Sequence, residues 1–449
     1  MNTTKYKLDY TNLFLATSGL IFFGIISRSI AYAPAALVEY LLIFLLLFFA
    51  IIHMAQSLRE QNDRSIIVYS FLIYLLLHSL ASIIFRPFIV DTTLYNVFFF
   101  TLSEFRISTI GYFLPLLFLP IAFDQNDKVR NFLILLLKIS IIYTFLEQAL
   151  SLMGYRSIFE TFYKSAGVVG DHYIGRKSFG MYRVWGFTGS PQLLGVFHIY
   201  ALVIMYINKD KLWAALSILG VIASTSKTAY IILVILVILY LLYNKHYLII
   251  FFSTIVFLGA VFQINEFYNY LKREEIQDYY AFQSLVQSIK GYFMLQNNVL
   301  VYDSIDVIRG GKAITREFSF LVEDGPFISF YNYFSNNPLE IIFGKGITYS
   351  FMAKDALPTE FIPYMATGSD FYILIFLEQY GLVGFIFLLI LFLFYPLYVF
   401  FKDGNYHAFV LIAFLFATLH YPPNVPKMMM LIVAYSIYNI YLVKRKEIK

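Results

Sequence analysis

The sequence contains no cysteine, and charged residues make up only 14% of its 449 residues. Without cysteine the chain can form neither a disulfide nor a thiolate metal site. Soluble globular domains carry about 25% charged residues, so the low charged fraction argues against a soluble protein. No internal repeat is visible either, and nothing in the sequence therefore indicates a chain built from two related halves.

Hydrophobic residues are what the sequence has in excess. They make up 60% of the chain, and the mean hydropathy is +0.71. They come in runs of about 20 residues, the length that crosses the hydrocarbon core of a bilayer. The pattern predicts an all-α polytopic membrane protein with a single integral membrane domain over residues 1–449. We expect about twelve transmembrane helices, near residues 11–27, 34–56, 65–84, 106–123, 132–152, 188–207, 212–224, 228–243, 247–263, 371–399, 407–420 and 428–443.

Lysine and arginine residues predict which ends of the spans face the cytoplasm. With the N-terminus inside, fourteen of them fall in cytoplasmic segments and five in short outside loops. The fourteen are Lys5, Lys7, Arg59, Arg64, Lys128, Arg130, Lys209, Lys211, Lys245, Lys402, Lys444, Arg445, Lys446 and Lys449, and the five are Arg28, Arg86, Arg106, Lys227 and Lys427. This bias predicts that both termini are cytoplasmic. The alternative is a signal peptide ending at residues 31–33, which would leave eleven spans and reverse the starting side.

Two of the predicted outside segments are long. They are residues 153–187 and residues 264–370, the latter between helices 9 and 10. Cytoplasmic connections such as 207–211 are short, so we expect the protein to work at the outer face of the membrane. Residues 265–293 have the pattern of an amphipathic helix, which could lie along the lipid headgroups. The alternative is a solvated helix that covers the outer mouth of the bundle.

Residues 181–196, "MYRVWGFTGSPQLLGV", place an arginine just before an apolar helix. We expect that helix to begin at Pro191, with Ser190 as its N-cap. A helix N-terminus presents bare N–H groups and partial positive charge, and the Arg183 guanidinium can bind phosphate through two hydrogen bonds. With Arg176 close in sequence, these residues predict an anion site at the outer surface. The alternative is that Arg183 pairs with a carboxylate or reaches the lipid headgroups.

Two further segments carry cations on the predicted outer side. Residues 222–230, "IASTSKTAY", place Lys227 in a tight turn between two spans. Ser224-x-x-Lys227 also matches the serine–lysine motif of penicillin-binding enzymes, but the partner motifs of those enzymes are missing. Residues 315–351 contain Arg316 and the sequence "NNPLEIIFGKGI".

Acidic residues stand out at the start of a late span and inside it. Asp370 lies at the outer start of the helix in residues 368–394, and Glu378 lies within it. The structural alternatives are that Asp370 caps the helix and that Glu378 hydrogen-bonds to a neighbouring side chain. Isolated polar residues in other spans are expected to make helix–helix contacts, with Lys138 pairing with Glu39 or Glu147.

In their order and spacing, four segments resemble the O-antigen polymerase (Wzy) family, within the wider superfamily of O-antigen polymerases and ligases. They are "RVWGFTGSPQLLG", similar to the family's Arg, Gly and Asn/Ser-Pro helix start, and "STSK", similar to its Thr-x-Ser-Arg turn with lysine in place of arginine. The other two are "REFSF…NNPLEIIFGKGI" and "SDFYILIFLEQYGLVGFIFLL". The resemblance covers residues 176–394 and implies a GT-C-like membrane enzyme.

The resemblance implies a glycosyltransferase that moves a growing glycan from undecaprenyl diphosphate onto a new lipid-linked repeat unit. The reaction would take place at the periplasmic face of the bacterial inner membrane. The leaving diphosphate gathers negative charge, which fixed cations stabilise. The candidates for binding it are Arg183, Arg316 and Lys227, assisted by Ser190 and Arg176.

The acceptor hydroxyl must lose a proton, so a carboxylate is expected to act as general base. Asp370 and Glu378 are the two candidates. If both lie on one helix, they face within about 80° of each other and lie about 12 Å apart. Asp370 is nearer the surface and is the preferred base.

The sequence has no Asp-x-Asp pair, and residues 28–33 hold no acid. Many other polyprenyl-phosphate glycosyltransferases place a metal-binding acid in that first outside loop. We therefore expect a metal-independent reaction without a cofactor. The expected partners are the two lipid-linked oligosaccharides, membrane lipid and a chain-length regulator protein, and no nucleic acid.

Two other functions remain open at this point. An O-antigen ligase would transfer the glycan to the lipid A core, but ligases of this superfamily typically carry a histidine where this chain has Ser369-Asp370. A polysaccharide flippase or transporter would show repeated halves and polar residues on broken helices at mid-membrane.

Overall fold

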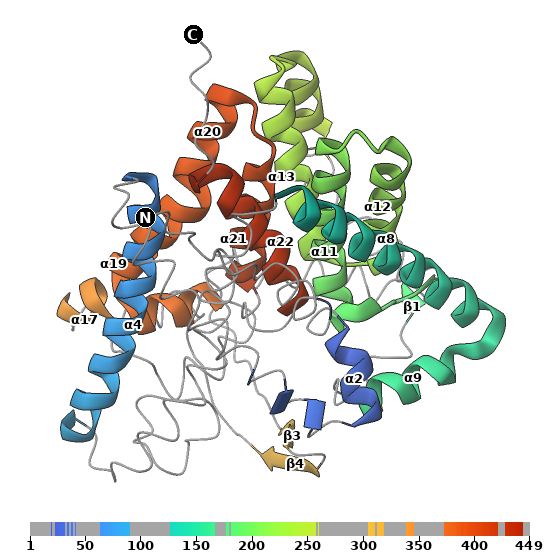
Figure 1. Cartoon of the computed structure of the whole chain (residues 1–449), viewed down its shortest axis with the longest axis horizontal. Coiled ribbons are helices and arrows are strands. Elements are labelled where there is room, and N and C mark those ends of the chain that lie inside the picture. The colour runs from blue at the N-terminus through green and yellow to red at the C-terminus, as the bar shows by residue number, and fades with distance from the viewer. Residues whose placement is uncertain are drawn as a thin grey trace, which may run out of the picture.

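A computed structural model describes the parts of the chain that carry most of the predicted spans. The described residues are 19, 23–31, 34–35, 37–38, 41, 63–89, 126–166, 177–178, 181–256, 259, 304–309, 312–317, 338–344, 372–420 and 427–442. Most of them are helical (Figure 1). Two predicted segments lie outside the described residues: the span near 106–123 and the amphipathic helix at 265–293. Of the predicted span near 34–56, only five residues are described.

The N-terminal part contributes helices that match several predicted spans. They are α2 (Gly24–Ile30), α4 (Asp63–Ile89), α8 (Asn126–Leu150), the π-helical turn η2 (Ser151–Tyr155), α9 (Arg156–Ser165), the 3-10 turn η3 (Gly186–Thr188), α11 (Pro191–Ile207), α12 (Lys211–Ser224) and α13 (Lys227–Tyr243). A further helical stretch covers residues 247–256. Residues 153–165, predicted as part of an external loop, are therefore helical.

The C-terminal part is a second group of helices. They are α17 (Pro338–Phe343), α19 (Tyr372–Leu389), η7 (Ile390–Phe394), α20 (Tyr395–Asp403), α21 (His407–His420), α22 (Lys427–Ile437) and η8 (Tyr438–Leu442). Two short antiparallel strand pairs, which the sequence did not predict, join β1 (Lys177–Ser178) to β2 (Met181–Tyr182) and β3 (Ser304–Arg309) to β4 (Lys312–Glu317).

The helix starts follow the local sequence. Pro191 is the first residue of α11, as predicted, because its missing N–H would have no partner in the first turn. Ser190 has the extended backbone of an N-cap, but its hydroxyl donates to Gln192 Oε1 at 2.6 Å rather than capping the helix. The N-cap of α13 does have the expected contact, because Ser226 Oγ accepts a hydrogen bond from Ala229 N.

Helix α11 lies at the centre of the described helices. It packs against α12, α13, α21 and α8, and most of its side chains are buried. One close crossing depends on glycine, because a Cβ on Gly220 of α12 would lie 2.7 Å from His198 Cγ of α11. His198 Nε2 also lies 3.1 Å from Thr144 Oγ1 of α8. Polar groups and a small residue thus fix how these three helices meet.

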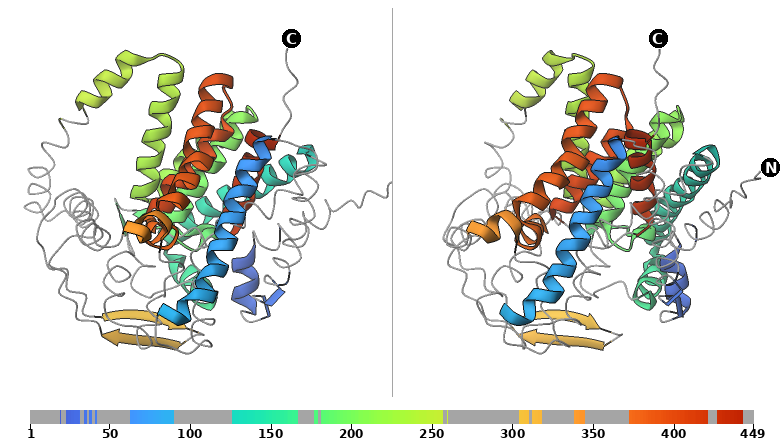
Figure 2. Two further views of the ribbon diagram at one scale, coloured as in Figure 1. Left: turned by 90° about the vertical axis from the view of Figure 1, so that its left-hand side faces the viewer. Right: turned by 60° about the vertical axis from the view of Figure 1, so that its left-hand side comes forward.

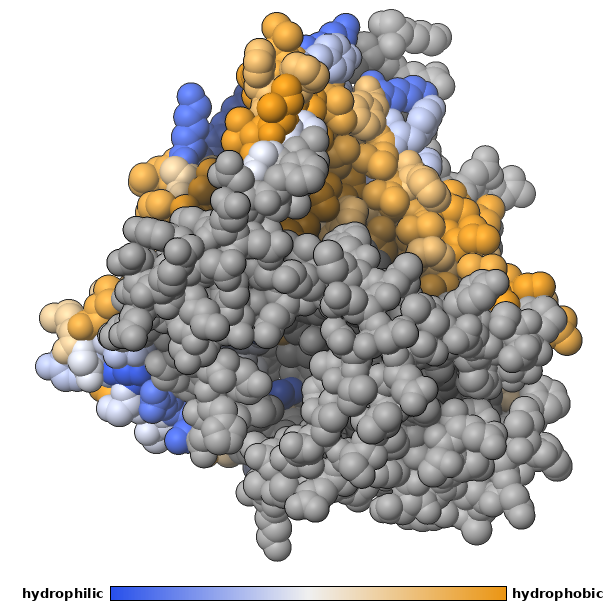
Figure 3. Space-filling view, turned by 180° about the vertical axis from the view of Figure 1, so that it is seen from behind, coloured by the Kyte–Doolittle hydropathy of each residue, from blue (hydrophilic) through white to orange (hydrophobic). Residues whose placement is uncertain are grey.

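Large hydrophobic side chains also cover much of the outer surface. Examples are exposed on α12, α13 and residues 247–256, including Leu219, Val234 and Phe252. Figure 3 shows hydrophobic residues over the upper part of the face seen from behind. Among the described residues, two helical stretches, Asp127–Ser165 and Gln379–Asp403, are long and apolar enough to cross a membrane, and seven shorter apolar helices accompany them.

Tyrosines gather where the ends of α11, α13 and α20 meet. The rings of Tyr206 and Tyr406 lie 5.0 Å apart, and those of Tyr243 and Phe400 lie 4.8 Å apart. We call this end of the molecule the tyrosine end. Four lysines lie next to it in sequence: Lys209, Lys211, Lys245 and Lys402. Strands β3 and β4 lie at the opposite end from α20 (Figures 1 and 2).

The predicted partners of Lys138 are wrong where the structure describes them. Lys138 Nζ lies 2.8 Å from Asp210 Oδ2, in the turn between α11 and α12. Glu147 instead pairs with Arg156. The physical reason is distance along α8. Lys138 lies in the middle of the helix, beside the α11–α12 turn, whereas Glu147 lies nine residues further on, near the C-terminal end of the helix.

Candidate functional site

The break after α8 brings α9 back toward the helix it follows. Gly154 has φ 95°, a conformation that glycine adopts without the strain a Cβ would cause. The chain therefore turns sharply within η2, and α9 packs against the end of α8. The turn directs Arg156 and Tyr163, both buried, toward the last two turns of α8.

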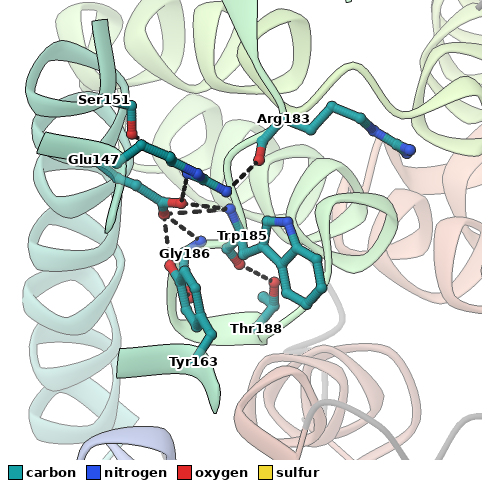
Figure 4. A network of polar contacts seen from close by, with 8 residues as sticks. Glu147, Ser151, Tyr163, Arg183, Trp185, Gly186 and Thr188 are labelled. Carbon is teal, nitrogen blue, oxygen red and sulfur yellow. Dashed lines mark hydrogen bonds and ion pairs between the residues drawn. The ribbon is translucent and has the colours of Figure 1, made fainter. Parts of the chain in front are cut away.

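The carboxylate of Glu147 is the centre of a buried polar network (Figure 4). Arg156 Nη1 donates to Glu147 Oε1 at 2.9 Å, and the Tyr163 hydroxyl donates to Glu147 Oε2 at 2.6 Å. Two backbone groups complete it, since Gly186 N donates to Oε2 at 2.9 Å and Trp185 N lies 3.1 Å from Oε1. Glu147 is fully buried, and an ion pair with these additional donors can keep a buried carboxylate charged.

The same side chains hold the backbone on both sides of Arg183. Arg156 Nη2 donates to Arg183 O at 3.2 Å, and the Tyr163 hydroxyl lies 3.2 Å from Gly186 O. With its amide oriented by these contacts, Gln148 donates to Tyr182 O at 2.9 Å and accepts from Tyr182 N at 3.3 Å. We call the set of Glu147, Gln148, Arg156 and Tyr163, acting on residues 182–186, the 182–186 clamp.

The Arg183 side chain is not part of the clamp. Figure 4 shows its guanidinium extending away from Glu147, while its carbonyl oxygen faces the clamp. Arg183 lies within electrostatic range of Tyr230, in the first turn of α13. The clamp therefore holds the backbone of Arg183 and leaves its side chain directed toward a different neighbour.

Lys227, predicted in the turn between two spans, is the first residue of α13, and the turn just before it lies beside the start of α11. Ser226 Oγ donates to Gln192 O at 3.2 Å. A Cβ on Gly195 of α11 would lie 2.6 Å from Ser224 Oγ and 2.8 Å from Ser226 Cβ, so glycine is needed for this close approach. The Tyr230 hydroxyl spans the turn by donating to Ile222 O at 2.9 Å. Two of the predicted cation-bearing segments thus meet at one end of the helices.

The other predicted diphosphate-binding residues are described less fully. Arg316 lies in β4, where it pairs with Ile305 of β3, but its side chain lies outside the described part of the structure. Arg176 lies outside it entirely, and so does Asp370. The roles predicted for these three residues stay predictions.

Glu378 lies in α19, one turn before a break in that helix. The break is at Gly381, which has φ 64° and ψ −172°. The end of α17 fits against it, since a Cβ on Gly344 would lie 2.6 Å from Gly381 N and still closer to the carbonyl oxygen of Gln379. The end of α17 and the break in α19 therefore touch through their backbones. The side chain of Glu378 lies outside the described part of the structure.

Helix α4 supplies donors to the carbonyl groups at this junction. The Tyr74 hydroxyl donates to Tyr380 O at 2.6 Å. His78 Nε2 lies 2.6 Å from Phe343 O, a contact that requires the proton on Nε2. A broken helix in an apolar environment leaves backbone groups that must find other partners, and α4 provides them.

The sequence pointed to Arg183 but not to the residues that hold it. Glu147 was expected to make an ordinary helix–helix contact, and Arg156 and Tyr163 were not singled out. The one signal in the sequence is an acid inside an apolar span, followed after Gly154 by a basic residue.

The described residues contain no candidate metal site. Among the described residues, no group of three or more histidine, aspartate and glutamate side chains is placed to hold a metal ion, and the metal-independent reaction stays a prediction.

Comparison of the chain with models of known protein families, with curated proteins and with solved structures found no match.

Proposed function

We propose that the protein is a polysaccharide polymerase that extends glycans on undecaprenyl diphosphate at the periplasmic face of the bacterial inner membrane. The proposal starts from the resemblance of four ordered segments to O-antigen polymerases. One structural observation carries it further. The segment of Arg183 and the turn of Lys227, far apart in sequence, meet at the start of α11 through the contact between Ser226 and Gln192.

In the proposed reaction the bond between the terminal sugar carbon of the growing glycan and the diphosphate oxygen breaks. The same carbon forms a bond to a hydroxyl oxygen of the new repeat unit. The diphosphate leaves with the bonding electrons, and Arg183 and Lys227, with Arg316, would stabilise its added negative charge. Asp370 or Glu378 would accept the proton of the attacking hydroxyl.

The proposed topology has about twelve spans and places both termini in the cytoplasm. Its support is the tyrosine end, where aromatic rings gather next to four lysines in sequence. Such a combination is typical of a cytoplasmic membrane interface. Arg183 and Lys227 belong to the opposite ends of α11 and α13, which would then face the periplasm.

Deletion of the gene tests the reaction. If the protein is a polymerase, the surface lipid of the deletion strain should carry a single repeat unit. If it is a ligase, that lipid should carry none, and lipid-linked polymer should accumulate in the membrane. A polysaccharide of unchanged length in the deletion strain would contradict both functions.

Substitution of the arginines tests the site. Arg183→Ala and Arg316→Ala should stop chain growth while the protein still reaches the membrane in normal amount. The control is Lys402→Ala, which removes one exposed cation at the tyrosine end. Normal chain length in both arginine variants would refute diphosphate binding by these residues.

One observation favours a second candidate function, the transport of lipid-linked oligosaccharide. Helix α19 is interrupted at Gly381, and broken helices are typical of transporters. The two functions separate in proteoliposomes that contain the purified protein and a lipid-linked repeat unit. A polymerase lengthens the glycan, whereas a transporter moves it to the other leaflet without lengthening it.

A further inference from the structure

We propose that Glu147, Arg156 and Tyr163 are positioning residues that fix the direction of the Arg183 guanidinium. This inference rests on the proposed function, because it assigns these residues to the binding of the donor diphosphate. None of the three needs to touch the substrate. They act through the backbone of residues 182–186, which the 182–186 clamp contacts on both sides of Arg183.

The first argument is the density of contacts around one residue. The clamp side chains form hydrogen bonds with the backbone of Tyr182, which precedes Arg183, and with the Arg183 carbonyl oxygen itself. They also accept hydrogen bonds from the backbone N–H groups of Trp185 and Gly186, which follow it. A guanidinium binds a phosphate with two parallel hydrogen bonds only when its plane and position are right. A displacement of about 1 Å can lower a rate about 100-fold, so a rigid backbone at Arg183 matters for the reaction.

The second argument is the choice of an ion pair. Apolar residues of similar size often stabilise a fold as well as a buried ion pair does, so stability alone does not explain a carboxylate here. A carboxylate accepts several N–H and O–H groups at once, which an apolar side chain cannot do. Glu147 uses this capacity to gather Trp185 N, Gly186 N, Tyr163 and Arg156 at one point.

The third argument is the charge of Glu147. Arg156 neutralises it at 2.9 Å, so the carboxylate does not draw in the guanidinium of Arg183, which extends the other way (Figure 4). Without Arg156, Glu147 would be the one charged residue left in the clamp, and its negative charge would have no positive partner there. The carboxylate would then attract Arg183, which lies in the clamped segment itself.

Tyr163→Phe is the most informative variant. It keeps the ring, which stacks on Trp185 with centroids 5.6 Å apart, and removes only the hydroxyl that contacts Glu147 Oε2 and Gly186 O. Loss of a member of the ion pair is expected to destabilise the fold much more. The matched control is Tyr441→Phe, which also removes a buried hydroxyl, one that donates to Leu391 O at 2.7 Å.

The measurement is chain growth by full-length protein in liposomes, with an undecaprenyl-diphosphate-linked repeat unit as donor and acceptor. Tyr163→Phe should lower kcat/KM about 10- to 100-fold, whereas Tyr441→Phe should leave kcat/KM unchanged. Each variant loses a buried hydrogen bond, so the thermal midpoint should fall in both. Arg156→Lys, which keeps the charge, should retain more activity than Arg156→Gln.

A double-mutant cycle separates positioning from a purely structural role. In an Arg183→Lys background, which has already lost the two-pronged contact, Tyr163→Phe should cause little further loss. Losses that multiply, or a Tyr163→Phe protein with wild-type kcat/KM, would overturn the positioning role while leaving the polymerase proposal standing. Wild-type activity of Arg183→Lys and Arg183→Ala would overturn diphosphate binding by Arg183, and the positioning role with it.

Discussion

The contact between Gly344 and the break in α19 makes a quantitative prediction about stability. Gly344 has φ 77°, which costs an alanine about 1–2 kcal/mol. Its Cβ would also overlap the carbonyl oxygen of Gln379 and lie 2.6 Å from Gly381 N. Both are backbone atoms that cannot rotate away, and such overpacking costs about 1–3 kcal/mol. Gly344→Ala should therefore destabilise the protein by ~2–5 kcal/mol.

Two other glycines serve as controls for the separate causes. Gly154 has φ 95°, but no described atom lies within 4 Å of the place a Cβ would take, so Gly154→Ala tests the backbone conformation alone. Gly259 is helical, with open space among the described residues and no positive φ, so Gly259→Ala should not destabilise the protein. The expected order of destabilisation is Gly344, then Gly154, then Gly259.

Thermal unfolding of the purified variants in detergent, followed by intrinsic fluorescence, measures this order. The difference between Gly344→Ala and Gly154→Ala isolates the contact of residues 338–344 with α19. Equal midpoints for the two variants would refute the close backbone contact. The segments that resemble the third and fourth family motifs would then not be joined at this point.

Three further predictions follow from the contacts and the sequence. Gly220→Ala should lower the free energy of unfolding by about 1–3 kcal/mol, because the added methyl group meets the His198 ring. In thermal unfolding, His198→Ala should destabilise the Gly220→Ala protein less than it destabilises the wild type. Ser226→Ala should lower stability by about 1 kcal/mol through loss of the acceptor for Ala229 N, which thermal unfolding measures. Chain growth should continue in the presence of a chelator, and activity that stops and returns with magnesium or manganese would contradict the metal-independent reaction.

The helices between residues 188 and 243 could be predicted closely from the sequence. The predicted spans 188–207, 212–224 and 228–243 correspond to α11, α12 and α13. Each span begins within three residues of its helix and ends at the same residue. The apolar runs there are separated by short polar turns, and Pro191 marks a start. These are local signals, so no knowledge of the tertiary structure was needed.

The 182–186 clamp could not be predicted in the same way. Its ion pair joins Glu147 to Arg156 across the sharp turn at Gly154, and helical spacing alone gives no reason to pair residues nine apart. Its other half is backbone N–H and C=O groups, which every residue carries and which leave no mark on the sequence. The resemblance drew attention to Arg183 itself, and the residues that support it became visible only when the chain was folded.

The contact of Gly344 with Gly381 lies between these cases. Both glycines stand out in the sequence, but periodicity cannot pair two segments separated by a long stretch of chain. Their positive φ angles and the backbone approach explain why glycine is needed at each. The glycines could thus be noticed from the sequence, whereas their common cause required the structure.

The absence of cysteine allows a direct test of which side of the membrane Arg183 faces. Any cysteine introduced by substitution is the only thiol in the protein. Lys164 of α9 is exposed, as are Lys211 and His246 near the tyrosine end. In spheroplasts, a membrane-impermeant maleimide should label the Lys164→Cys protein and leave the Lys211→Cys and His246→Cys proteins unlabelled until the membrane is opened.

The result bears on Arg183 because Lys164 is fixed to the same side of the molecule. Its neighbour Tyr163 contacts Gly186 O and Glu147, and Glu147 in turn holds the backbone next to Arg183. Labelling of residue 164 from outside therefore places Arg183 on the periplasmic side, whether or not the protein has been shown to be active. The opposite pattern, with residues 211 and 246 labelled and 164 protected, would put the guanidinium on the cytoplasmic side. A diphosphate donor that reacts in the periplasm could not reach it there, and the proposed polymerase mechanism would fail on topology alone.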